Sequence, residues 1–332
     1  AGLAADRDWR WRRVAAEAFE AARARDRLEA QLEDPDGRVV ARALDGLRRL
    51  VPPEDAALGD RARRLLAHDD PAVRSVAADL LARRPEVTDL DALVAAYRRA
   101  SDDPFNDARL SAVAALGAIA AASPTGRAQV AERFVAAAPR PDDYLVRRLA
   151  ADTIPGAREA WGPAFPIATG RGLAEYRDVA RRWLAPALGG QPNPRVRLET
   201  DRGTLDIELL PAEAPLTVAA FLELVERRFF DGTRWHRVVP NFVVQDGDPR
   251  GDGWGGPGAG FLLRDEINPV RYEPGTVGMA LSGPDTGGSQ YFITHSRQPH
   301  LDGIYTVFGR VVGGLGVLDE IGQGDRIRSV QR

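Results

Sequence analysis

Residues 235–248 hold the densest group of side chains that could do chemistry. Side chains alternate along a strand, so Arg237 and Val239 would share one face of a strand in this stretch. Phe242 and Gln245 follow a Pro-Asn bend, which brings a charged donor, an amide and a ring near each other. The chemistry open to this group is hydrogen bonding from a cation beside an apolar surface. The alternative interpretation is a surface arginine beside a core phenylalanine.

Two other groups suggest different reactions but fit them poorly. Ser289, His295 and Ser296 would suit a hydrolase, but the segment lacks the G-x-S-x-G turn that exposes a nucleophilic serine. Residues 251–256 match G-x-G-x-x-G, yet a dinucleotide site needs that motif to begin a helix after a strand. A Pro-Gly pair follows instead, so we expect a surface loop.

The cysteine and histidine content of the chain argues against a metal site or a cofactor. The chain has no cysteine, which excludes disulfides, thiolate chemistry and cysteine zinc sites. Only two of its four histidines lie close together, and we expect His236 to be packed inside a barrel. We therefore predict neither a metal site nor a cofactor. The four histidines are His68, His236, His295 and His300.

The composition is that of a globular protein with more than one domain. The chain has 332 residues, of which 44% are hydrophobic and 28% charged, and a single core rarely extends beyond about 250–300 residues. No run of apolar residues is long enough for a membrane span. The 45 basic residues, all arginine, stand against 48 acidic ones, so a nucleic-acid partner is not expected.

The first half of the chain repeats with a period near 36 residues. An Asp-Pro pair at 34–35 precedes Leu44 as a second pair at 70–71 precedes Leu80. Aspartate before proline suits the start of a helix, and apolar residues at fixed positions after it supply a buried stripe. The pattern resembles the HEAT-like repeats of an α-solenoid over about 14–154. An irregular helical bundle is the alternative.

The second half of the chain has the period of strands. Glycine and proline at 189–194 are typical of a linker, and apolar residues then alternate with polar ones across a hairpin at 201–203. A helix is predicted over 217–228, and short β-type runs separated by glycine-rich turns favour a closed antiparallel barrel. The predicted domains are a HEAT-like helical domain over 1–188, closed by a helical segment at 161–188, a linker over 189–194 and a barrel domain over 195–332.

Four motifs of the second domain resemble those of cyclophilin-type peptidyl-prolyl cis/trans isomerases. Residues 235–248 are similar to the family segment F-H-R-x-x-P-x-F-x-x-Q-x-G-D. The resemblance extends from about Arg195 to Val330, and it implies an eight-stranded closed barrel with two helices, the second near 315–320. The other three motifs follow in the family's order at 278–280, 287–293 and 300–309.

The same resemblance implies the site residues. Arg237 would be the catalytic group, with Phe242 and Gln245 beside it, in an apolar pocket for proline that uses no metal and no cofactor. The residues that the resemblance places against the substrate are Val243, Ala280, Leu281, Ser282, Gln290, Phe292, His300, Leu301 and Tyr305.

One charged donor at an apolar pocket is enough for this reaction. Rotation about an Xaa-Pro bond must break amide resonance, against a barrier of about 18–20 kcal/mol. The proline nitrogen gains a free lone pair only in the twisted transition state, where it can accept a hydrogen bond from Arg237. An interaction made only in the transition state lowers the barrier.

Three positions depart from the family's usual residues. His300 stands where the family usually has Trp, Tyr305 where it has His, and Val243 where it has Met. An aromatic or apolar group remains at each position, so we expect activity to persist. Because that Trp contributes to cyclosporin binding in the family, we also expect weak inhibition by cyclosporin.

The sequence leaves functions of different classes open. In the first, the protein isomerises proline-containing, unfolded or partly folded polypeptides as a folding chaperone, and the helical repeats recruit clients or a protein partner. In the second, it is a proline-peptide binding scaffold with incidental isomerase activity; in a third, the helices only buttress the barrel. The composition favours a bacterial source, and a removed export signal before Ala1 would make the protein extracytoplasmic (periplasmic), but the compartment stays open.

Overall fold

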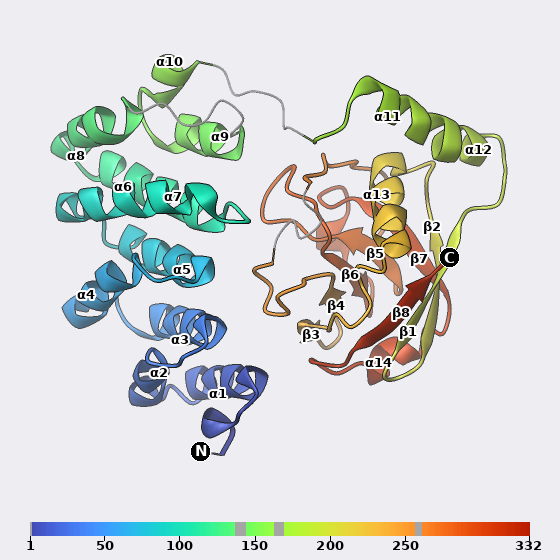
Figure 1. The fold of residues 1–332 in the computed structure, drawn as a ribbon, viewed down its shortest axis with the longest axis horizontal. Helices are drawn as coiled ribbons and strands as arrows, with labels where there is room; N and C mark the ends of the chain where they lie inside the picture. Colours follow the sequence, from blue (N-terminus) through green and yellow to red (C-terminus); the bar gives the residue numbers. More distant parts are fainter. Residues whose placement is uncertain (1, 137–143, 163–168, 256–260) are drawn as a thin grey trace. The chain divides into compact units, whose positions relative to one another are not determined.

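The chain forms two compact units, residues 1–166 and residues 167–332. Figure 1 shows helices in the first unit, and a sheet with a few helices in the second. Within the residues that the structure describes, every helix falls short of the length and hydrophobicity of a membrane span. The computed structural model describes residues 2–136, 144–162, 169–255 and 261–332.

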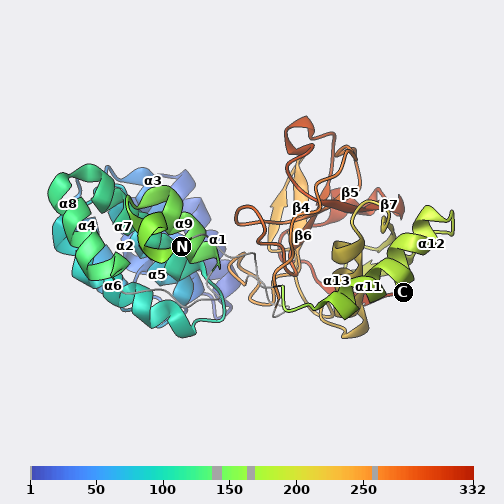
Figure 2. The same ribbon diagram turned by 90° about the horizontal axis from the view of Figure 1, so that it is seen from above.

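The first unit consists of helices in two layers. They are α1 (Trp9–Ala21), α2 (Arg25–Gln31), α3 (Gly37–Leu50), α4 (Ala56–Leu65), α5 (Pro71–Ala82), α6 (Leu90–Arg99), α7 (Asp107–Ala122), α8 (Pro124–Val130), α9 (Tyr144–Thr153) and α10 (Ala157–Trp161). In one layer α1, α3, α5, α7 and α9 each pack on the next, and α2, α4, α6 and α8 form the other (Figures 1 and 2). The predicted helical region is thereby confirmed, and its assignment to HEAT repeats stays a prediction.

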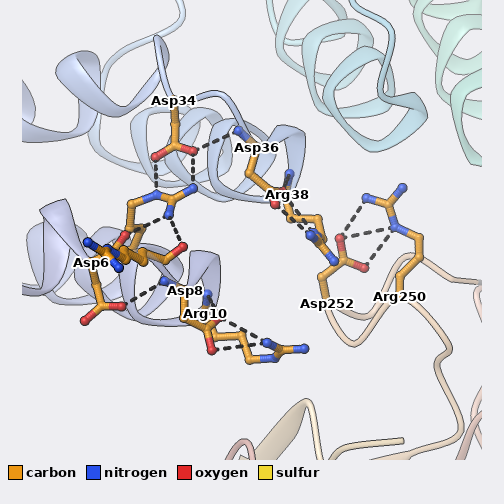
Figure 3. A network of polar contacts seen from close by, with 10 residues as sticks. Asp6, Asp8, Arg10, Asp34, Asp36, Arg38, Arg250 and Asp252 are labelled. Atoms are coloured by element: carbon orange, nitrogen blue, oxygen red, sulfur yellow. Dashed lines mark hydrogen bonds and ion pairs between the residues drawn. The ribbon is translucent and has the colours of Figure 1, made fainter.

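One predicted helix start is confirmed and another is shifted. Helix α5 begins at its Asp-Pro pair, where Asp70 accepts a hydrogen bond from the N–H two residues further on. Helix α3 begins two residues later than its Asp-Pro pair, and Asp36 caps it instead. Asp34 is engaged elsewhere, because its two oxygens accept hydrogen bonds from Arg12 at 2.7 and 2.9 Å (Figure 3).

The second unit begins with helices that the sequence had placed in the helical domain. Helix α11 and the π-helical turn after it pack on α13. Trp183 in that turn packs against the core of the sheet, and the Arg332 guanidinium carbon lies 5.0 Å from its ring centre. Residues 169–188 therefore pack with the sheet unit, while 163–168 of the predicted closing segment lie outside the described residues. The helices are α11 (Leu173–Val179), α12 (Ala185–Leu188) and α13 (Pro215–Glu226).

One eight-stranded antiparallel sheet curves into a half-barrel. Its strands are β1 (Arg195–Thr200), β2 (Thr204–Leu209), β3 (Arg237–Val239), β4 (Val243–Asp246), β5 (Thr276–Met279), β6 (Tyr291–Thr294), β7 (Val307–Gly313) and β8 (Ile327–Gln331). They lie in the order β3-β4-β6-β5-β7-β2-β1-β8. The predicted closed barrel is wrong, since β3 and β8 remain edges. The short β3 forms no ladder of hydrogen bonds with β8. An isolated β-bridge between Arg234 and Arg326 joins the segments that precede the two strands.

Helix α13 supplies one side of the core under the sheet. Its predicted apolar face is buried, and the Phe221 ring centre lies 5.0 Å from that of Phe230 and 5.3 Å from that of Phe308. The helix covers 215–226 instead of the predicted 217–228, and the second predicted helix is α14 (Val317–Glu320). This packed core fixes the strands that carry the candidate site.

The start of α13 is capped by a carboxylate from a distant loop. Glu266 accepts hydrogen bonds from the N–H groups of Leu216 and Thr217, at 3.0 and 2.7 Å, and from the Thr217 hydroxyl at 2.7 Å. The Ala214 N-cap offers no side-chain hydrogen bond of its own.

We expect Glu266→Ala to lower the free energy of unfolding of the second unit by about 1–2 kcal/mol, because the first turn of α13 loses its cap. Urea unfolding followed by circular dichroism checks this. The exposed Glu226→Ala, at the other end of the same helix, is the matched control. Equal unfolding midpoints for both variants would contradict the capping role.

Candidate active site

The register of a β-hairpin sets the polar side of the site. Arg237 on β3 pairs directly with Gln245 on β4, and Asn241 takes a left-handed conformation (φ 59°) in the turn, which asparagine tolerates. The Arg237 Nη1 donates to Gln245 Oε1 at 3.3 Å, and Gln245 Nε2 donates to Gln290 Oε1 at 3.0 Å. Gln290 in turn donates to the Gly253 carbonyl at 3.1 Å. The two amides and the guanidinium thus form one chain.

An apolar cavity of about 190 Å³ opens beside this chain. Val243, Phe292 and Leu301 are buried in its wall. The lining comes from four separate parts of the fold, namely the β3–β4 hairpin, the segment after β5, β6, and the segment before β7. The lining residues are Arg237, Phe242, Val243, Gln245, Ala280, Leu281, Phe292, Leu301 and Tyr305.

Aromatic rings give the cavity its shape. The Phe242 ring stacks on His300 with centres 5.6 Å apart, and Phe292 meets Tyr305 edge to face at 5.8 Å. The Arg237 guanidinium carbon lies 5.4 Å from the Phe242 ring centre, a cation–π distance. His300 is exposed and stacks on a residue of the cavity wall, but it is not among the residues that line the cavity.

The cavity walls change the electrostatics of its one cation. Partial desolvation lowers the pKa of Arg237, because it disfavours the charged form, and the nearby Tyr305 opposes this effect. An arginine nevertheless stays protonated in proteins. The guanidinium is therefore a permanent donor held at an apolar surface, where a hydrogen bond is stronger than in water.

A second, smaller hollow of about 90 Å³ adjoins the first along the glutamine chain. The predicted Ser282 lies here, and its N–H donates to the Thr286 hydroxyl at 2.8 Å. Sequence reasoning missed Thr286 and Gly253, and the loop of Gly253 comes near Gln290 only in the fold. The residues around the hollow are Gln245, Gly253, Ala280, Leu281, Ser282, Thr286, Gly288, Ser289 and Gln290.

The groups that suggested other reactions have structural contacts. The Ser289 hydroxyl is buried and donates to the Gly247 carbonyl at 2.7 Å, while His295 Nε2 lies 3.0 Å from the Leu318 carbonyl. These contacts hold the two side chains apart from any hydrolase arrangement. His236 is buried, as predicted. Among the described residues no three acidic or histidine side chains gather as a metal site would require.

The glycine-rich segment after β4 is a loop in its described part. Asp248 accepts hydrogen bonds from the N–H groups of Arg250, Asp252 and Gly253, which fold the chain back on itself. No helix begins within residues 251–255, so the phosphate-binding arrangement is not formed there. The last glycine of the motif and the Pro-Gly pair after it lie outside the described residues.

The half-barrel and its cavity define an antiparallel β protein that can hold a peptide backbone beside an apolar pocket. A family model described as "Cyclophilin type peptidyl-prolyl cis-trans isomerase/CLD" matches residues 195–331. Peptidyl-prolyl cis-trans isomerase B of Bacillus subtilis is 47% identical over 131 residues, which cover 40% of this chain and 92% of the relative. The chain belongs to the cyclophilin family and is a peptidyl-prolyl cis-trans isomerase.

Further relatives cover the same part of the chain. A peptidyl-prolyl cis-trans isomerase of Synechococcus elongatus is 46% identical over 136 residues, which cover 40% of this chain and 92% of the relative. A crystal structure of a cyclophilin-type isomerase from Cryptosporidium parvum is 32% identical and covers 42% of this chain and 96% of that chain, with a TM-score of 0.40.

Proposed function

We propose that Arg237 catalyses isomerisation by donating a hydrogen bond to the proline nitrogen of a polypeptide whose proline ring occupies the 190 Å³ cavity. The observation that supports this is the position of a partly desolvated guanidinium beside the Phe242 ring and the Gln245 amide. The planar Xaa-Pro amide has no lone pair for this donor, whereas the twisted amide does. The hydrogen bond therefore favours the transition state selectively.

The remaining polar groups position the substrate in this proposal. Gln245 would also orient the catalytic group, because its Oε1 accepts a hydrogen bond from the Arg237 guanidinium while its Nε2 donates to Gln290. The peptide backbone would run along these amides, with the residues before the proline over the smaller hollow. The cavity itself takes the proline ring, whose burial against Phe292 and Leu301 supplies apolar binding energy.

Two measurements on one peptide, its cis–trans exchange rate and its binding, distinguish an active isomerase from a proline-peptide binding scaffold. Two-dimensional NMR exchange between cis and trans forms of an Ala-Pro peptide gives the catalysed rate, and titration of the same peptide gives its Kd. The proposal requires that Arg237→Ala lowers the rate far more than it weakens binding. A variant that binds less tightly but turns over bound peptide as fast as the wild type would refute the role of Arg237.

We propose that the helical unit recruits unfolded clients for the isomerase. The helices of the first unit stack in two layers, and stacked helix pairs are the arrangement with which α-solenoids build extended binding surfaces. An unfolded competitor protein without proline should then slow catalysed refolding of a proline-limited protein but leave turnover of a short peptide unchanged. Equal rates of refolding with and without the competitor would leave the helices without a client-binding role.

We further expect cyclosporin to inhibit the enzyme weakly. The rim position that carries Trp in the family is the exposed His300, whose smaller ring stacks on Phe242 and offers less apolar area to a bulky ligand. Inhibition of peptide isomerisation is the measurement, and His300→Trp should strengthen it. Nanomolar inhibition of the wild type would contradict this expectation.

A further inference from the structure

Behind the cavity wall, Tyr272 is fully buried without lining the cavity. It precedes β5 and belongs to a small apolar cluster with Val243, Phe292 and Leu301, which are all cavity residues. Its ring stacks on that of Phe292 with centres 5.5 Å apart and planes 24° apart. Phe292 also meets the Tyr305 ring edge to face, with centres 5.8 Å apart. Phe292 thus contacts two tyrosine rings.

The backbone beside these rings leaves no spare room. A Cβ atom placed on Gly278 in β5 would lie 2.6 Å from Phe292 Cζ and 2.8 Å from Tyr272 Cε1, and it would also collide with the Tyr272 hydroxyl. Real side chains do not approach so closely, so both rings depend on glycine at this position. The Tyr272 hydroxyl is buried against the strand, and the described residues provide no hydrogen-bond partner for it.

Tyr272 is also fixed through its own backbone to the segment that carries another cavity residue, Leu301. Its N–H donates to Asp302 Oδ1 at 2.9 Å, and its carbonyl accepts the Gln298 N–H at 2.9 Å. These two partners flank the turn that carries His300 and Leu301. Tyr272 therefore contacts Phe292, which forms the floor of the cavity, with its ring. With its main chain it contacts the turn at the cavity rim.

We propose that Tyr272 is a positioning residue that holds Phe292 at the depth which the proline ring requires, with Gly278 as its necessary partner. This inference rests on the proposed use of the cavity for proline. Loosening the floor should weaken the contacts of a bound proline ring while leaving the Arg237 donor in place. The expected signature is a loss of substrate affinity, with a much smaller change in turnover at saturation.

Three variants test the proposal by KM and kcat with one Ala-Pro peptide. Tyr272→Leu loses the stacked ring, and we expect KM and Kd to rise on the order of threefold to tenfold. Tyr272→Phe keeps the ring and should stay within about twofold of the wild type. Phe308→Leu is the matched control, because it removes a buried ring from the main core and should lower stability with KM unchanged.

Gly278→Ala gives an independent test of the same packing. The added methyl group should raise KM in the wild-type background, and it should cost less affinity in the Tyr272→Leu background, since fewer ring atoms oppose it. Additive effects of the two substitutions would contradict direct contact between them.

One measurement on the wild-type protein covers the case in which the variants do not fold. A wedged Phe292 should flip slowly, so its paired ring protons should give separate NMR signals at low temperature. Averaged signals, or a Tyr272→Leu variant with unchanged KM, would overturn the proposal. If Arg237→Ala still slows turnover by about 10- to 100-fold in that case, the proposed function stands. If the wild type binds no proline peptide, the proposed function itself falls.

Discussion

Replacing Arg237 by alanine is expected to slow catalysed isomerisation by about 10- to 100-fold. The reason is the loss of one charge-assisted hydrogen bond, worth about 1.5–3 kcal/mol, at an atom that accepts it only in the twisted transition state. The substrate's ground state makes no such bond, so the Kd for an Ala-Pro peptide should change by less than about threefold. NMR exchange rates and a peptide titration measure the two quantities on the same samples.

The matched variant is Arg237→Lys. Lysine keeps the charge but lacks the planar fork that reaches both Gln245 and the substrate, so we expect a rate between those of wild type and alanine. The fold should be unaffected, because the side chain is exposed at an edge strand. An alanine variant with the wild-type rate, or a Kd that rises as steeply as the rate falls, would contradict transition-state donation.

The second large effect concerns Asp246, which is fully buried on β4 next to Gln245. Burial raises its pKa from 3.8 to about 7, with a smaller contribution from the charge of Asp248. The geometry agrees with a protonated carboxyl. The Thr233 hydroxyl lies 2.8 Å from the Phe230 carbonyl and 2.7 Å from Asp246 Oδ2, and it has only one proton to donate. If it donates to the carbonyl, the carboxyl must donate to it.

Stability should therefore fall as the pH rises. Below pH 3.8 Asp246 carries its proton in both the folded and the unfolded chain; between 3.8 and about 7 the unfolded chain loses it first, which favours unfolding. Above pH 7 the difference is constant, at up to about 4 kcal/mol relative to a residue that does not titrate. Asp246→Asn keeps a donor towards Thr233 and removes this dependence.

Urea unfolding of wild type and Asp246→Asn between pH 4 and pH 8 measures the effect, with amide exchange in β4 and β6 as the local probe of the second unit. The difference between the two proteins should grow in favour of asparagine as the pH rises. A difference that does not change with pH would show that Asp246 is already ionised in the folded protein. A carbon-13 titration of the carboxyl group reports its pKa directly.

The polar side of the candidate site could be predicted because it is local. Arg237, Phe242 and Gln245 lie within nine residues of one hairpin, whose turn brings Gln245 opposite Arg237. Ala280, Phe292, Leu301 and Tyr305 were predicted only through resemblance to a family, since they come from separate parts of the chain. Their meeting at one cavity depends on long-range pairing of β4 with β6 and β6 with β5.

Tyr272 and Asp246 show what sequence reasoning could not reach. Nothing in a loop tyrosine indicates that its ring will stack on Phe292, because that contact requires the segment before β5 to fold against β6. An aspartate between glutamine and glycine is ordinarily exposed, and its burial follows from the direction in which β4 faces the core. Both side chains acquire their properties from neighbours far away in the sequence.

Local periodicity by itself determined that the chain has a helical half and a β half, where α13 lies, and that one arginine would face a ring and an amide. The tertiary structure decided that 169–188 pack with the sheet unit, that the sheet stays an open half-barrel, and how deep the cavity is. The physical reason is the separation in sequence between the residues that determine each feature. Helix and strand patterns depend on residues a few positions apart, whereas strand edges, cavity walls and buried charges depend on contacts between segments that are distant in the chain.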